Sequence, residues 1–261
     1  MTHSNRDDKT LIIKSNFNLI RPGFLTKKKL ITAFNGKKAE LLHGKKRKIS
    51  ALLFKNYRQL KFIPSQDDTA LMILFSKNKF GPFPGCNWKI SFKPIDKATL
   101  KYQVFVPADF DFVKGGKLPG LAGGLGNTGG LIPNGSDGWS VRFMFKENGT
   151  LCAYAYYPDM HCDFGEKLFL MEGDFRATLK TGQWNQIELA IKMNQPHLNN
   201  GGITARLNGE GLISIQHLNF RKTEMLKIDH LLFSCFMGGD DRSYAPSKDQ
   251  SLLFKNFIVT Q

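Results

Sequence analysis

Short apolar segments recur along most of the chain, and clusters of Gly, Pro, Asn and Asp separate them. Apolar and polar residues alternate within many of these segments, which is the pattern of a strand with one buried face. No long helical repeat lies between them, so we predict an all-β protein whose antiparallel strands form a two-sheet β-sandwich, or jelly roll. The predicted strands are 70–76, 88–93, 99–106, 139–146, 151–157, 184–193, 203–207, 212–216, 231–237 and 252–259.

One predicted hairpin has an apolar row and a polar row on each of its strands. Successive side chains of a strand point to opposite faces of the sheet. The first strand directs Ser140, Arg142 and Met144 away from its apolar row, and the second directs Tyr154 and Tyr156 away from its own. We therefore expect these five side chains to share one face.

The turn of this hairpin decides which side chains become neighbours. A two-residue turn at Asn148-Gly149 would place the apolar row of one strand beside the tyrosine row of the other. A three-residue loop with Gly149 at the left-handed bulge position instead aligns the two apolar rows. Paired Cβ atoms then lie roughly 5 Å apart. The predicted pairs are Lys146 with Thr150, Phe145 with Leu151, Phe143 with Ala153, Arg142 with Tyr154, and Ser140 with Tyr156.

A glycine-rich segment precedes the hairpin. Lys114 and Lys117 flank a glycine pair, which would let the backbone approach a ligand closely. We interpret this segment as a loop and the run 120–130 as a mobile lid over a groove, because the run lacks the ending of a phosphate-binding loop. Two lysines, an arginine and two tyrosines suit an anionic sugar better than a neutral one.

Positive charge is concentrated at the amino terminus. The formal net charge is +15, and residues 1–60 hold 15 Lys+Arg against 3 Asp+Glu. We expect a basic extension over 1–60 and the sandwich over 61–261. The extension would be attracted to polyanions, such as nucleic acid, wall polymer or an acidic membrane surface, or would simply be solvated. The chain has no recognisable nucleic-acid-binding motif.

The short apolar segments, the amino-terminal residues and the spacing of the cysteines argue against several classes of protein. No stretch approaches the roughly 18 apolar residues of a membrane-spanning helix, and the first ten residues lack the apolar core of a secretory signal. The cysteines have no metal-binding spacing, and we expect buried free thiols: Cys86, Cys152, Cys162 and Cys235. His161 lies near two aspartates, but a local hydrogen bond is favoured over a metal site. We expect no metal and no cofactor.

Four motifs occur in register along the chain: KGGKLPGLAGG (114–124), DGWSVRFMF (137–145), AYAYYP (153–158), and FSCFMGGDDRSYAPSKD (233–249) followed by LLFKNFIV. Together they resemble polysaccharide lyase family 14, which includes glucuronan and alginate lyases of algal viruses and molluscs. The resemblance runs from about residue 70 to the carboxyl terminus. Tyr244 stands where the family pattern leads us to expect tryptophan, so the resemblance does not identify the sugar.

The resemblance implies β-elimination on a polyuronate, with Lys117, Arg142, Tyr154 and Tyr156 as catalytic residues. Ser140 and Lys114 are then candidates for binding substrate. A cation must neutralise the uronate carboxylate before the neighbouring proton can leave. Either tyrosine could transfer protons if nearby cations lower its pKa, and Lys117 is the alternative base.

Two other functions are consistent with parts of the sequence. A non-catalytic jelly roll could bind anionic cell-wall polysaccharide with the same groove. A surface-binding or nucleic-acid-binding protein could act through the basic segment 1–60. We expect a monomer whose partner is an anionic polysaccharide.

Overall fold

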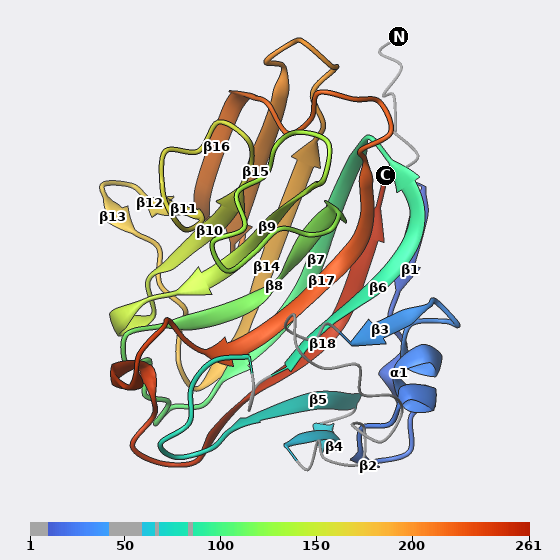
Figure 1. Ribbon diagram of the computed structural model, residues 1–261. Helices are drawn as coiled ribbons and strands as arrows, with labels where there is room; N and C mark the ends of the chain where they lie inside the picture. The colour runs from blue at the N-terminus through green and yellow to red at the C-terminus, as the bar shows by residue number, and fades with distance from the viewer. Residues whose placement is uncertain (1–9, 42–58, 66–67, 83–85) are drawn as a thin grey trace, which may run out of the picture.

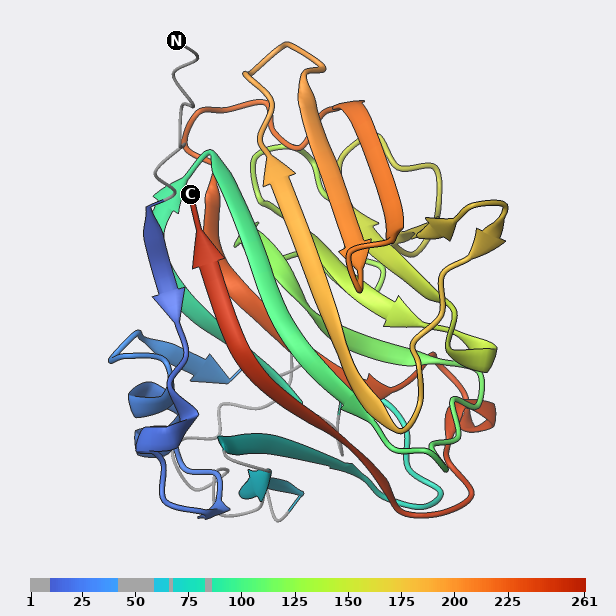
Figure 2. The same cartoon turned by 180° about the vertical axis from the view of Figure 1, so that it is seen from behind.

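The computed structural model describes residues 10–41, 59–65, 68–82 and 86–261. Within these residues two antiparallel sheets lie one over the other, which confirms the predicted sandwich (Figures 1 and 2). One α-helix, α1 (Lys27–Ala33), lies beside the lower part of the sandwich. No helix in the described ranges has the length and apolar character needed to span a membrane.

The larger sheet holds eleven of the described strands. β1 (Leu11–Lys14) joins it by pairing with β18. The other strands, in their order across the sheet, are β13 (Phe175–Arg176), β12 (Met171–Glu172), β16 (Gly211–Leu218), β15 (Gly201–Leu207), β14 (Gln183–Lys192), β7 (Lys97–Val106), β18 (Gln250–Thr260), β5 (Asp68–Phe75), β4 (Leu60–Ser65) and β2 (Gly23–Phe24).

The smaller sheet holds seven described strands and includes the hairpin predicted from the sequence. Each of the ten predicted strand segments overlaps an observed strand. The order of this sheet is β11 (Glu166–Phe169), β10 (Leu151–Tyr156), β9 (Gly138–Phe145), β8 (Gly116–Gly124), β17 (Ile228–Met237), β6 (Cys86–Ile95) and β3 (Ala39–Leu41).

Aromatic side chains fill the space between the sheets. Trp88 stacks on Phe233 with ring centroids 4.2 Å apart, and Phe233 meets Phe254 of the larger sheet at 5.4 Å. The Tyr102 hydroxyl of β7 donates a hydrogen bond of 3.1 Å to the carbonyl of Pro119 in β8. This bond joins the two sheets directly across the core, so a polar atom is satisfied inside an apolar interior.

β8 corrects the interpretation of the glycine-rich segment as a loop and lid. Residues 116–124 form a buried strand between β9 and β17, and only the remainder of 120–130 is loop. The glycines are required by close neighbours: a Cβ on Gly120 would lie 2.0 Å from the Val141 carbonyl oxygen, and one on Gly123 would lie 1.9 Å from that of Lys227. Their small size lets the strand fit where a side chain would clash.

The described part of the amino-terminal segment belongs to the sandwich. β1 pairs with β18, and Ile13, Phe17 and Phe34 are buried in the common core. The expected boundary at residue 60 therefore does not hold for residues 10–41. The lysine run 27–29 forms the first turn of α1, whose Thr26 side chain accepts a hydrogen bond from the Lys29 N–H. The second basic run, 45–48, lies outside the described residues.

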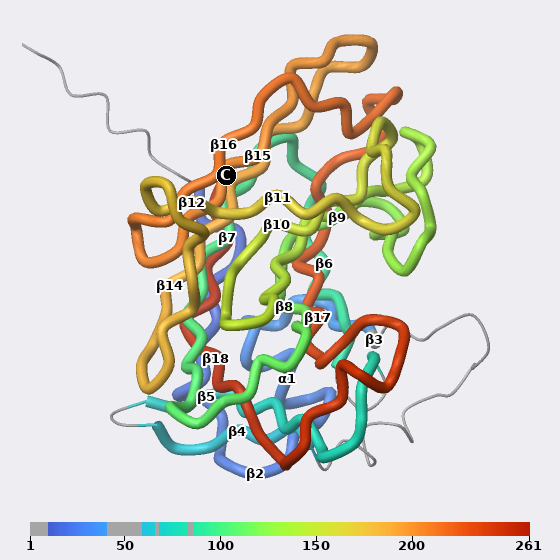
Figure 3. The backbone as a smooth tube through the Cα atoms, turned by 90° about the vertical axis from the view of Figure 1, so that its left-hand side faces the viewer, coloured from blue at the N-terminus to red at the C-terminus, as the bar shows by residue number. Residues whose placement is uncertain are grey.

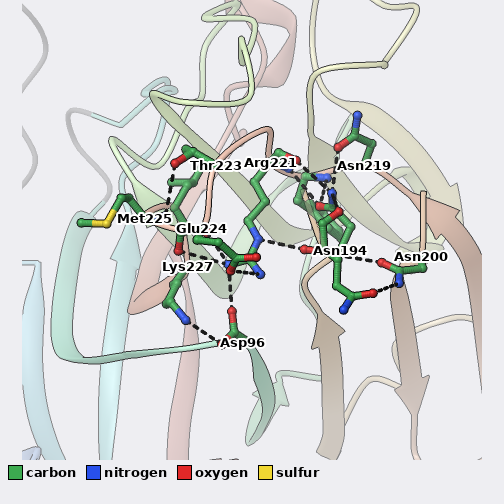
Figure 4. Close-up of polar contacts among 12 residues, drawn as sticks. Asp96, Asn194, Asn200, Asn219, Arg221, Thr223, Glu224, Met225 and Lys227 are labelled. Atoms are coloured by element: carbon green, nitrogen blue, oxygen red, sulfur yellow. Dashed lines mark hydrogen bonds and ion pairs between the residues drawn. The ribbon is translucent and has the colours of Figure 1, made fainter. Parts of the chain in front are cut away.

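A buried polar network joins three connections at one end of the sandwich (Figure 4). Asn194 accepts hydrogen bonds from the N–H groups of Phe220 and Arg221, and the Arg221 Nε donates to the Asn194 carbonyl at 2.8 Å. The Arg221 guanidinium also pairs with Asp96 at 2.8 Å and Glu224 at 3.2 Å. Because both charge and hydrogen bonds are satisfied, we assign this arginine a structural role.

All four cysteines are free thiols in the structure. Three of them are buried as expected, whereas Cys162 is exposed in the connection between β10 and β11.

Candidate active site

A pocket of about 390 Å³ opens on the face of the smaller sheet that points away from the larger sheet. β8, β9 and β10 form its floor, and the connections that follow β8, β10 and β17 contribute to its walls. Figure 3 shows β9, β10 and β11 side by side, with the β8–β9 and β10–β11 connections together at one end. Its lining residues are Pro82, Asn87, Lys117, Thr128, Gly129, Arg142, Met144, Lys146, Tyr154, Tyr156, Phe164, Lys167, Phe236, Gly238, Gly239, Asp240 and Tyr244.

The register predicted for the hairpin is confirmed. Arg142 pairs with Tyr154 and Ser140 with Tyr156 across β9 and β10. Gly149 has a φ of 76°, the left-handed conformation expected at the bulge. This register places the Arg142 guanidinium carbon 5.7 Å from the centre of the Tyr154 ring and 6.0 Å from that of Tyr156.

Lys117 reaches the same pocket from β8. It pairs with Met144 of β9, and its Nζ donates to the Met144 sulfur at 3.0 Å. The same ammonium lies 3.6 Å from the centre of the Tyr154 ring, within the range of a cation–π contact. Lys117 was predicted to act from a loop, whereas the structure fixes it on a strand next to the hairpin.

The two phenol rings line the pocket, and both side chains are largely buried. Tyr154 and Tyr156 meet edge to face with centroids 5.5 Å apart. The Gly130 N–H donates a hydrogen bond of 3.3 Å to the Tyr156 hydroxyl. The β8–β9 connection therefore helps to hold this phenol in place.

The cations of the pocket floor have no acidic partner among the described residues. The Arg142 Nη1 donates to the Ser234 hydroxyl at 3.2 Å, and its buried Nε has no hydrogen-bond partner within the described structure. No carboxylate in that part of the chain lies within 4.0 Å of the charged atoms of Lys117 or Arg142. A buried cation without a counter-ion is costly, so the site is arranged to receive an anion.

Burial changes the proton affinities of these groups. Burial, and next the charge of Arg142, hold the pKa of Lys117 well below its usual 10.5. Burial raises the pKa of Tyr154 above its usual 10.0, and Tyr156 adds to this effect more than Arg142 opposes it. The expected lowering of a tyrosine pKa by nearby cations is therefore wrong for Tyr154, because desolvation dominates.

The two predicted binding residues lie outside the pocket lining. Ser140 is fully buried, and its hydroxyl donates to the Asn127 carbonyl at 2.6 Å. Lys114 is exposed, and its backbone carbonyl accepts a hydrogen bond of 3.0 Å from Lys146 Nζ. Direct contact of either side chain with substrate stays a prediction.

The sequence analysis missed several residues of the pocket. Lys146 follows Arg142 and Met144 on the same face of the first hairpin strand, so its position could have been inferred from alternation. Lys167 could not, because the short strand β11 gave no clear sequence signal, and Phe164 lies in the connection before that strand.

The turn after β17 also contributes to the pocket. Gly238, Gly239 and Asp240 line it, and the Asp241 side chain accepts the Ser243 N–H at 2.6 Å. Within the described ranges no three His, Cys, Asp or Glu residues gather as a metal site would require, and this includes the surroundings of His161.

Comparison with known proteins gives a family match and similar folds. Residues 65–257 match the sequence profile of the family Polysaccharide lyase 14. The chain is 24% identical over 210 residues to Exolysin of Paramecium bursaria Chlorella virus 1. The match covers 67% of this chain and 31% of Exolysin, so the chain spans about a third of that relative.

Solved structures share the fold. The alginate lyase Aly36B superposes with a TM-score of 0.80 at 18% identity, over 97% of each chain. The alginate lyase vAL-1 from Chlorella virus superposes with a TM-score of 0.65 at 25% identity, over 78% of this chain and 89% of that one.

Proposed function

Because the chain belongs to polysaccharide lyase family 14, we propose that it cleaves an acidic polyuronate by β-elimination and leaves unsaturated uronate ends. The main support is that one pocket is lined by Lys117, Arg142, Tyr154 and Tyr156. Among the described residues, neither of the two basic side chains forms an ion pair with a carboxylate. Glucuronan, mannuronan and guluronan all present the carboxylate that this pocket would bind. Aly36B has been solved in complex with an alginate tetrasaccharide, which supports a uronate chain as the ligand.

Arg142 would neutralise the substrate carboxylate. The proton on the carbon next to a uronate carboxylate is weakly acidic, because its removal adds charge to a group that is already negative. A guanidinium donates two parallel hydrogen bonds to a carboxylate and stabilises the enolate-like intermediate. Its buried position strengthens this electrostatic effect.

Lys117 and Tyr154 suit the two proton transfers. The lowered pKa of Lys117 favours a neutral amine that can take the proton from the carbon next to the carboxylate. The raised pKa of Tyr154 favours a protonated phenol that can give its proton to the departing glycosidic oxygen. The carbon–oxygen bond breaks as the carbon–carbon double bond forms, so no water is consumed. Tyr156, beside Tyr154, is the other candidate for proton transfer.

Ultraviolet absorbance of the unsaturated ends tests this proposal. Purified protein is mixed with glucuronan, polymannuronate and polyguluronate, and we expect absorbance to rise on at least one of them. Lys117→Ala should abolish the rise, whereas Arg206→Gln on the outer face of β15 should leave it unchanged. Binding of all three polymers without any absorbance change from neutral to alkaline pH would favour a non-catalytic carbohydrate-binding module instead.

A further inference from the structure

Four basic side chains line the pocket, and the proposed chemistry uses only two of them. The four basic residues are Lys117, Arg142, Lys146 and Lys167. The lining includes only one carboxylate, that of Asp240. Arg142, Lys146 and Lys167 carry like charges, which repel one another and create a positive potential in the cleft. The proton transfers and the bond cleavage therefore do not explain why Lys146 and Lys167 line the pocket.

The register of the sheet places these two lysines away from Arg142. Lys146 lies four residues beyond Arg142 along the same strand direction, which corresponds to about 13 Å of extended chain. Lys167 of β11 pairs with Tyr154, which in turn pairs with Arg142. Lys167 and Arg142 are thus two strands apart, about 10 Å at the backbone. One carboxylate cannot contact all these cations.

Both lysines are available to an anionic ligand. Neither forms an ion pair with a carboxylate in the described part of the chain. Lys146 is half-buried and donates one hydrogen bond, to the Lys114 carbonyl, while Lys167 is exposed at the rim. An ammonium carries three donors, so each lysine retains donors for a ligand.

We propose that Lys146 and Lys167, which the same register places roughly 16 Å apart at the backbone, form a second, extended carboxylate-binding subsite, in which each lysine holds a different uronate of the chain whose scissile sugar lies at Arg142. This inference rests on the proposed function, since it takes the ligand to be a uronate chain. The substrate is then a run of uronates long enough to place carboxylates at Arg142 and at both lysines. The subsite contributes to binding and positioning, and it takes no part in proton transfer.

Charge-neutral variants test the subsite. Lys146→Gln and Lys167→Gln are compared with the wild type and with Lys192→Gln, an exposed lysine at the end of β14 in the other sheet. Each pocket variant should weaken binding of a mannuronate or glucuronate tetrasaccharide about tenfold, as expected for the loss of a charge-assisted hydrogen bond. The KM for polymer should rise similarly with little change in kcat. The dependence of this KM on salt concentration should become weaker, because fewer counter-ions are released when the polymer binds.

Two outcomes separate this inference from the proposed function. The proposed second subsite is wrong if both pocket variants bind the tetrasaccharide as tightly as Lys192→Gln does and have the same KM for polymer. The proposed lyase activity is unaffected by that result. If the variants weaken binding but no protein produces unsaturated ends, the subsite stands and the proposed reaction is wrong.

Discussion

Arg142 of β9 lies directly opposite Tyr154 of β10, and its guanidinium carbon is 5.7 Å from the centre of the phenol ring. The pair results from a three-residue hairpin loop that aligns two apolar rows on the other face of the sheet. Core packing thus determines which polar side chains meet in the pocket. A one-residue change of register would send the tyrosines to the opposite face and remove the site.

Replacement of Arg142 should remove most of the activity and leave the fold intact. Arg142→Gln eliminates the cation that neutralises the substrate carboxylate, and such losses typically cost about 10² to 10³ in rate. The fold should persist, because this arginine has no carboxylate partner among the described residues. Initial rates and thermal unfolding of the variant and of Arg206→Gln check this. A variant with undiminished kcat/KM would show that Arg142 does not contact the reacting sugar.

The pH dependence of kcat/KM should reflect Lys117 and Tyr154. A base must be deprotonated in the free enzyme, so activity should rise with pH through the lowered pKa of Lys117, well below 10.5. An acid must be protonated, so activity should fall only above the usual tyrosine pKa of 10.0. Initial rates from acidic to strongly alkaline pH measure both limbs. A rising limb near 10.5 would contradict the assignment of Lys117 as the base.

Replacement of Lys117 by an apolar residue should stabilise the protein. Because the pKa of Lys117 is lower in the folded state, the unfolded chain binds the extra proton between that lowered pKa and about 10.4. Stability of the wild type therefore rises with pH across this window. Lys117→Met removes this penalty at neutral pH, and each kcal/mol gained should raise the melting temperature by roughly 2–4 °C. Calorimetry of both proteins at neutral pH and above pH 10 checks the sign. An equal loss of stability at both pH values would indicate that burial of the ammonium costs nothing.

Residues 10–41 should be essential for stability. Phe34 is fully buried, with ring centroids 5.9 Å from Phe17 and 5.7 Å from Phe257 of β18. Phe34→Ala should destabilise the protein by about 3–5 kcal/mol, as is typical for a cavity left by a buried ring. Denaturant unfolding measures this change, with the exposed Leu19→Ala as the control. If the Phe34 variant is as stable as the control, residues 10–41 do not contribute to the stability of the sandwich, and a domain boundary at residue 60 is favoured instead.

The features that could be predicted correctly were those that follow from the alternation of apolar and polar residues along a strand. The hairpin register followed from two apolar rows and one glycine, and it placed Arg142 beside Tyr154 correctly. β8 was missed because glycine has low strand propensity, and its need for glycine becomes clear only when Val141 and Lys227 are seen against it. The amino-terminal segment was interpreted as an extension because of its positive charge, although eight apolar residues within 10–41 are buried in the core.

The proton affinities of the site could not be read from residue types. The sequence shows that cations and tyrosines come together, which by itself would lower a tyrosine pKa. It does not show how far the Tyr154 phenol and the Lys117 amine are withdrawn from water. Burial is the largest cause of both shifts, and it favours the neutral amine of the lysine and the protonated phenol of the tyrosine.

The most direct test of the central claim is the fate of water during cleavage. The polymer is cut in water enriched in heavy oxygen, and the new chain ends are analysed by mass spectrometry. Elimination at Lys117 and Arg142 predicts ends that carry a carbon–carbon double bond and no heavy oxygen. Saturated non-reducing ends and products heavier by one water for each cut would show hydrolysis and would contradict the mechanism.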